Sequence, residues 1–404
     1  MQLFEGEEPE FDELSLNFTI DELREALISG YGEEAAKLQW GTPDAEMVRH
    51  LYRNVYQFSV AKNFTQMRTL TSALIDENGH TRSFSDFMTE AAKIDKKFNV
   101  DYLRAEYDTA INSAEMASHW VRFKQMGDPM LRYVTVGDER VRESHAAMNG
   151  IQRPMSDPIW DKIYPPNGWN CRCTVVTTTG AATPGKQISM PWDVPPLFQT
   201  NLAKTGMLWP KDHPYFTALP GPTAKRMVEQ SDDRYLAFAV NQAVEFAQEE
   251  GKNTNTAFHM SSYKAAMEII SKTIGLNSAI SISKTGEYGT GKILTTPRSI
   301  KNAFKSRNHS ETLEEKYALL YVLRNPQSIR FTASKPLGAG KDLTDEINRK
   351  NIKKKDDQGV THYNYYNFDY NDKPYTLHMQ AIGTNYELIY AVYPGYDRYP
   401  QDKK

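Results

Sequence analysis

Both cysteines of this chain of 404 residues lie in one short segment, in which a single arginine separates Cys171 from Cys173. Asp138 and His145 lie upstream of them, before a proline-rich stretch. Zinc ions in proteins usually take four ligands from thiolate, imidazole and carboxylate groups. The sequence therefore predicts a candidate metal site made of Asp138, His145, Cys171 and Cys173.

Two other interpretations of the cysteine pair compete with metal binding. The acidic start of the chain, MQLFEGEEPEF, lacks the features of a signal peptide, so we expect the protein in the cytosol, where thiols stay reduced. Cysteines at this spacing also close a strained ring when oxidised, which disfavours a disulfide. The other interpretation, two packed thiols with His145 capping a turn, stays open because Cys-x-Cys is a weaker zinc signal than Cys-x2-Cys.

The elements that must hold these residues are mostly helical. Apolar residues recur at spacings of three and four across 101–126, which predicts an amphipathic helix. Thr19 with Glu22 matches a capping box and predicts an earlier helix start. β-Branched or alternating residues predict strands at 131–136 and 173–179, with a turn-rich crossing between them. We expect a helical N-terminal domain that carries a small β/turn-rich segment.

The last third of the chain has a different pattern. A capping box at Thr312 and Glu315 predicts a helix, and several strand candidates follow it. The dipeptide Asn371-Asp372 between two of these strands predicts a hairpin turn. Helices followed by an antiparallel meander give the chain an α+β fold class.

Charge is also distributed unevenly. Between Lys292 and Lys373 there are 16 Lys or Arg and 10 Asp or Glu, a local net charge of +6, whereas the whole chain carries −3. A basic module in an acidic chain indicates nucleic-acid binding. The alternative is a solvated basic loop, because the run NRKNIKKKDD supplies much of the excess. No complete Walker A loop, GxSxG elbow or HExxH motif supports P-loop, serine-nucleophile or zincin chemistry.

An ordered set of residues runs from the end of the 101–126 helix to the cysteine pair. It is similar to the motif set of the phage Mu protein F-like head morphogenesis family, the minor head proteins, over roughly 30–220. The resemblance implies a phage or prophage head protein that acts near the portal during capsid assembly. The Asp, His and two Cys recur in that family, which favours a structural Zn²⁺. The matched residues are Trp120, Asp138, Arg140, Arg142, His145, Gly150, Asp157, Pro158, Trp160, Pro165, Pro166, Gly168, Trp169, Cys171, Arg172 and Cys173.

The C-terminal part has a basic helix, a histidine after it, a helix that ends in NPQSIRF and a meander. This order resembles the phage-associated barnase–EndoU–colicin–RelE-like nucleases. Such ribonucleases need no metal, because a base, a cation and an acid together carry out the transesterification. The resemblance implies that His309 transfers a proton, that Arg307, Lys305 and Lys301 stabilise the phosphorane, and that His362, His378 or Tyr393 supplies the second proton-transfer group.

These patterns predict a Mu F-like head morphogenesis domain at 1–220 with its core motif at 100–176, a helical connector and linker at 221–254, and a nuclease-like effector domain at 255–404. The expected partners are phage portal and head proteins, RNA for the C-terminal domain, and an immunity protein. An alternative is a purely structural minor head protein whose C-terminal domain binds nucleic acid or a partner without catalysis. No apolar run is long enough to span a bilayer, so we expect no membrane partner and a location in the virion head or the host cytoplasm.

Overall fold

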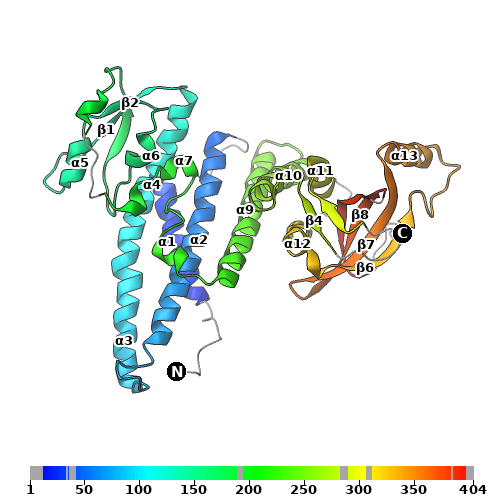
Figure 1. Cartoon of the computed structure of the whole chain (residues 1–404), viewed down its shortest axis with the longest axis horizontal. Helices are drawn as coiled ribbons and strands as arrows, with labels where there is room; N and C mark the ends of the chain where they lie inside the picture. The colour runs from blue at the N-terminus through cyan, green and yellow to red at the C-terminus, as the bar shows by residue number, and fades with distance from the viewer. Residues whose placement is uncertain are drawn as a thin grey trace. The chain divides into compact units, whose positions relative to one another are not determined.

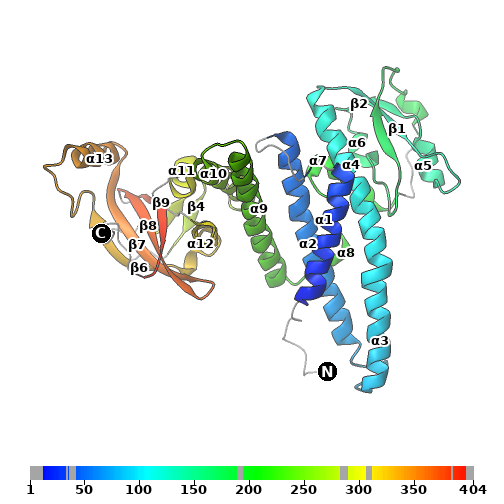
Figure 2. The same cartoon turned by 180° about the vertical axis from the view of Figure 1, so that it is seen from behind.

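The computed structural model describes residues 12–32, 35, 42–188, 194–282, 290–305, 312–383 and 385–396. The chain forms two compact units, Met1–Ser231 and Asp232–Lys404. The point of division lies within helix α9, Gly221–Glu249. Figures 1 and 2 show the long helices of the first unit and the sheet of the second.

The first unit is built on helices that lie side by side. The predicted apolar stripe of the 101–126 helix is confirmed, because Ala110, Ala114 and Ala117 are completely buried. Helices α1 and α4 approach closely, and a Cβ at Gly30 would lie 2.1 Å from the backbone oxygen of Ile111. The helices are α1 Glu13–Tyr31, α2 Pro43–Ser72, α3 Phe84–Lys96 and α4 Leu103–Gln125, with a π-helical turn at Lys97–Tyr102 joining α3 to α4.

The predicted helix start at Thr19 is wrong. Helix α1 begins earlier, where the Asp12 carboxylate accepts hydrogen bonds from the backbone N–H groups of Leu14 and Ser15. Thr19 is buried within the helix. A helix extends past a local capping pattern when a better N-cap and further packed residues lie upstream of it.

The predicted β/turn-rich segment follows α4. It forms a small antiparallel sheet in the order β2-β1-β3, made of β1 Met130–Val134, β2 Gln152–Pro154 and β3 Thr174–Thr177. The turn-rich crossing includes α5 Glu143–Met148 and α6 Trp160–Ile163, and short helices α7 Leu202–Thr205 and α8 Pro214–Thr217 follow later. The Tyr164 hydroxyl donates to the Met116 carbonyl at 3.0 Å, which ties this crossing to α4.

The second unit combines helices with a sheet, as predicted. The Thr312–Glu315 capping box is confirmed, and it begins α12. The described sheet has the order β4-β5-β9-β8-β7-β6. Its elements are α10 Thr254–Thr273, β4 Ala279–Ser281, β5 Lys292–Leu294, α11 Pro297–Lys305, α12 Leu313–Arg324, β6 Arg330–Pro336, α13 Glu346–Asp356, β7 Val360–Tyr370, β8 Lys373–Ile382 and β9 Tyr386–Pro394.

The predicted meander is confirmed for β6 to β9, and the hairpin turn at Asn371-Asp372 has φ values of 48° and 57°. The sheet as a whole is mixed, because β5 pairs in parallel with β9. The short strands β4 and β5 gave no alternating pattern long enough to predict them. Within the described ranges, no helix combines the length and apolar character that crossing a bilayer needs.

Candidate functional sites

The first candidate site brings His145 together with the two cysteines. Helix α5 carries His145, and Cys173 lies directly before β3. One donor atom from each of the three side chains lies within 4.8 Å of the others. The Nδ1 atom of His145 is 3.8 Å from Sγ of Cys171 and 3.4 Å from Sγ of Cys173. All three side chains are buried.

Hydrogen bonds orient the imidazole of His145. Its Nε2 atom lies 3.2 Å from the backbone carbonyl oxygen of Asn167, which can only accept. Nε2 therefore donates its proton there, and Nδ1 presents a lone pair to the two sulfur atoms. The side chain of Asn167 accepts a 2.8 Å hydrogen bond from the Tyr133 hydroxyl on β1, so the small sheet fixes the residue that orients the histidine.

Asp138, the fourth predicted ligand, makes a different interaction. Both of its oxygens accept from the Arg172 guanidinium, at 2.7 and 2.8 Å, and Arg140 lies 3.5 Å away. The hydrogen bond from Arg172 lowers the pKa of Asp138 to about 2. A second arginine also ties the crossing together, because Arg142 donates to the Trp169 carbonyl at 2.8 Å.

The two thiols differ in acidity. The hydrogen bond with Cys173 lowers the pKa of Cys171 to about 4. The same bond, together with burial, raises the pKa of the Cys173 thiol. Cys171 is therefore the more acidic of the two thiols.

A cavity of about 190 Å³ reaches the cluster from the protein surface. Arg140, Arg142 and Arg172 line it together with His145 and the cysteines. The cavity presents positive charge to anything that approaches the sulfur atoms from solvent.

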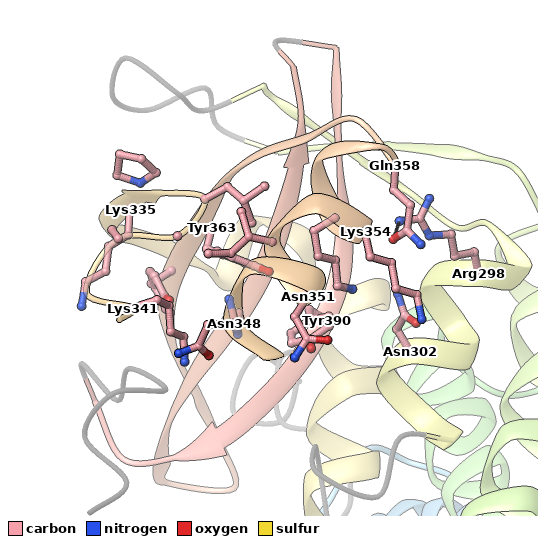
Figure 3. Close-up of a pocket in the computed structure, with 18 of the residues that line it drawn as sticks. Arg298, Asn302, Lys335, Lys341, Asn348, Asn351, Lys354, Gln358, Tyr363 and Tyr390 are labelled. Atoms are coloured by element: carbon pink, nitrogen blue, oxygen red, sulfur yellow. Dashed lines mark hydrogen bonds between the residues drawn. The ribbon is translucent and has the colours of Figure 1, made fainter. Parts of the chain in front are cut away.

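The second candidate site is a cavity of about 900 Å³ in the second unit. Helix α11 forms one wall, and Figure 3 shows Arg298 and Asn302 there, with Lys335 and Lys341 at the opposite end and Lys354 on α13 between them. Among the described residues that line it, none is Asp or Glu, and six are basic: Arg298, Lys301, Lys335, Lys341, Lys354 and Lys355.

Aromatic rings from the sheet form the floor of this cavity. Tyr365 on β7 stacks on His378 of the neighbouring β8, with ring centroids 4.7 Å apart, and the Tyr390 ring lies 5.0 Å from the same histidine. The Lys355 ammonium lies 4.8 Å from the Tyr390 ring centroid. Burial, with Arg298 and Lys354 nearby, lowers the pKa of Lys355 to about 8.

The structure gathers some of the predicted catalytic residues in this cavity and leaves others elsewhere. Lys301 and His378 line it. Lys305, at the end of α11, and His362, on β7, are not among the lining residues. The Tyr393 ring lies 6.4 Å from that of His378 without lining the cavity. The remaining two candidates, Arg307 and His309, lie outside the described residues.

Sequence reasoning missed much of this cavity. The basic run that offered a solvated-loop interpretation forms α13, and its Lys354 and Lys355 line the cavity. Arg298 lies at the start of α11, where its side chain donates to Gln358 at 2.5 Å. The only signal that pointed to these residues was the local excess of positive charge.

Comparisons with known proteins concern the first unit. The profile of the family described as "Phage Mu protein F like protein" matches residues 21–176. Over 73 residues the chain is 42% identical to "Mu-like prophage FluMu F protein" of Haemophilus influenzae, covering 18% of this chain and 17% of that protein. Over 80 residues it is 34% identical to "Putative capsid assembly protein F" of Escherichia phage Mu, covering 20% and 16%. The chain thus spans about a sixth of the length of these relatives. No solved structure matches it significantly.

Proposed function

We propose that this chain, whose residues 21–176 match the profile of the phage Mu protein F-like family, acts in phage or prophage head assembly, close to the portal. The match of this segment to its family carries the proposal, and the printed name of the phage Mu relative, a putative capsid assembly protein, supports it. The expected partners are portal and head proteins.

The test is whether the chain is present in phage heads and binds the portal protein. We expect mass spectrometry of gradient-purified heads to detect it, and an affinity-tagged copy to recover the portal protein from infected or induced cells. A version lacking residues 21–176 should lose both properties. Absence of the full chain from purified heads and from portal complexes would contradict the proposal.

We propose a second function, RNA binding and cleavage, for the unit Asp232–Lys404. The observation that carries it is the large cavity with six basic residues and a floor of tyrosines and histidine. Cationic side chains bind a phosphodiester backbone, and aromatic rings stack on bases. This proposal rests on the cavity and not on any relative.

Cleavage in this cavity would follow the metal-independent route. A base removes the proton of the ribose 2′-hydroxyl, the 2′-oxygen forms a bond to phosphorus, and the 5′-oxygen leaves after an acid protonates it. We assign one of these proton transfers to His378, and the stabilisation of charge on the phosphoryl oxygens to Lys301, because both residues line the cavity. His309 stays a prediction for the other proton-transfer group. An acidic immunity protein is the partner that would neutralise this cavity.

Incubation of the full chain with RNA, with and without EDTA, separates cleavage from simple binding. Cleavage that survives EDTA, disappears in His378→Ala and fails on 2′-O-methyl RNA would support the enzyme. Retention of RNA without cleavage would favour the alternative of a non-catalytic binding domain. If the full chain neither cleaves nor retains RNA, the second function is wrong.

A further inference from the structure

We propose that His145, Cys171 and Cys173 bind one Zn²⁺ ion through three protein ligands, and that the fourth position faces the arginine-lined cavity and takes water or a small anion. This site differs from the predicted set of four because Asp138 is not one of the ligands. The inference does not depend on either function proposed above.

The separations of the donor atoms fit a tetrahedral zinc ion. Zinc binds thiolate sulfur at about 2.3 Å and imidazole nitrogen at about 2.0–2.1 Å, which places sulfur and nitrogen ligands about 3.5–3.6 Å apart in a tetrahedron. The two sulfur atoms lie 3.4 and 3.8 Å from Nδ1 of His145. Both nitrogen–sulfur separations are therefore within a few tenths of an ångström of the tetrahedral value.

A hydrogen bond from His145 Nε2 orients the imidazole for metal binding through Nδ1. The Nε2–H group donates to the Asn167 carbonyl, the kind of contact that fixes the tautomer of metal-binding histidines. The lone pair of Nδ1 is thereby directed at the sulfurs. Asn167 Nδ2 is also buried and has no hydrogen-bond partner among the described residues.

Charge and ligand chemistry favour zinc over other common metals. Two thiolates and a neutral imidazole around a divalent ion have no net charge, so the centre can be buried without an unpaired charge. Soft sulfur ligands select zinc over magnesium or calcium. Three protein ligands with an open fourth position is also the arrangement of zinc sites that bind an exchangeable ligand.

The open position faces a positively charged cavity. Arg140 and Arg142 line it, and Arg172 is held there by Asp138. Asp138 is not among the residues whose donor atoms cluster here, and Arg172 holds its carboxylate with two short hydrogen bonds. An exchangeable anion or water therefore completes the coordination more readily than this aspartate.

Metal content tests the ligand set directly. The full chain, expressed with zinc in the medium and dialysed, should carry one zinc per chain by elemental analysis, as should Asp138→Asn. The variants Cys173→Ser and His145→Gln should each retain less than a tenth of that amount. Arg172→Gln is the matched control for Asp138→Asn, because it breaks the same ion pair and leaves the carboxylate in place.

A measurement on the unaltered chain covers the case in which a variant fails to fold. Replacing zinc with Co²⁺ should give a thiolate-to-cobalt charge-transfer band and the intense visible bands of tetrahedral cobalt, and added azide should shift the visible bands by binding at the open position. The inference is overturned if the unaltered chain holds no zinc and gives no cobalt bands, if Cys173→Ser keeps its zinc, or if Asp138→Asn loses zinc that Arg172→Gln retains. A cobalt spectrum insensitive to anions would overturn the open position.

Discussion

The basic cavity of the second unit makes a quantitative prediction about salt. Each cation that contacts single-stranded nucleic acid contributes about −0.7 to the slope of log Kobs against log salt concentration. With six basic residues lining the cavity, the limiting slope is about −4. Affinity should then fall about 300-fold between 50 and 200 mM salt, by the same relation.

Removing two of these charges should change the slope by a known amount. We expect the double variant Lys341→Gln/Lys354→Gln to have a slope shallower by about 1.4, so that the same salt change weakens binding about 50-fold. Both side chains line the cavity and are exposed, so their replacement should leave the fold intact. The matched control is Lys350→Gln/Lys353→Gln, which removes the same charge from α13 at positions outside the lining.

Fluorescence anisotropy of a labelled 2′-O-methyl RNA, titrated with the full chain at several salt concentrations, measures these slopes without cleavage. The control should keep the slope of the unaltered protein. Equal slopes for the two double variants would refute the assignment of this cavity as the nucleic-acid site, because charges outside the lining would then contribute as much as those within it.

Three further predictions concern stability and are measured by urea unfolding. Lys62→Met should destabilise the chain by about 3–5 kcal/mol, because Lys62 is buried 2.5 Å from the Glu106 carboxylate and its removal leaves that charge unpaired. Adding Glu106→Leu should restore much of the lost stability, and a further decrease in stability would contradict this explanation. Burial lowers the pKa of Lys316 from 10.5 to about 7, so the unfolded chain binds more protons than the folded chain between pH 7 and 10.5, and the free energy of unfolding should rise with pH there. Lys316→Met should flatten that rise, and an unchanged pH profile would show that Lys316 does not cause it. Gly30→Ala should lower the free energy of unfolding by roughly 1–3 kcal/mol or more, because its Cβ would collide with the Ile111 carbonyl. An unchanged urea midpoint would show that α1 and α4 can move apart without loss of stability.

Local patterns in the sequence were enough to predict much of the fold. The buried stripe of α4, the capping box at Thr312 and the hairpin at Asn371-Asp372 each depend on residues a few positions apart. The same is true of the ordered motif that the chain shares with the phage Mu protein F-like family, whose profile matches residues 21–176. Thr19 shows the limit of such patterns, because a stronger cap upstream determined where α1 begins.

The make-up of the candidate sites was harder to predict than the helices, because it depends on packing between residues far apart in the sequence. The sequence named His145, Cys171 and Cys173 as ligands, but residue types alone gave Asp138 an equal claim. The structure assigns Asp138 to Arg172, because a bidentate guanidinium contact forms once the crossing folds back on itself.

The large cavity was the feature that the sequence predicted least. Its lining extends from Tyr263 on α10 to Tyr390 on β9, and strand register decides which side chains share its floor. By itself, the sequence determined α4, α12, the hairpin, the resemblance of the first unit to the phage Mu protein F-like family and the basic character of the last third. Only the tertiary structure decided which of the basic and aromatic side chains meet in one cavity, because that depends on strand pairing and helix packing between residues far apart in the chain.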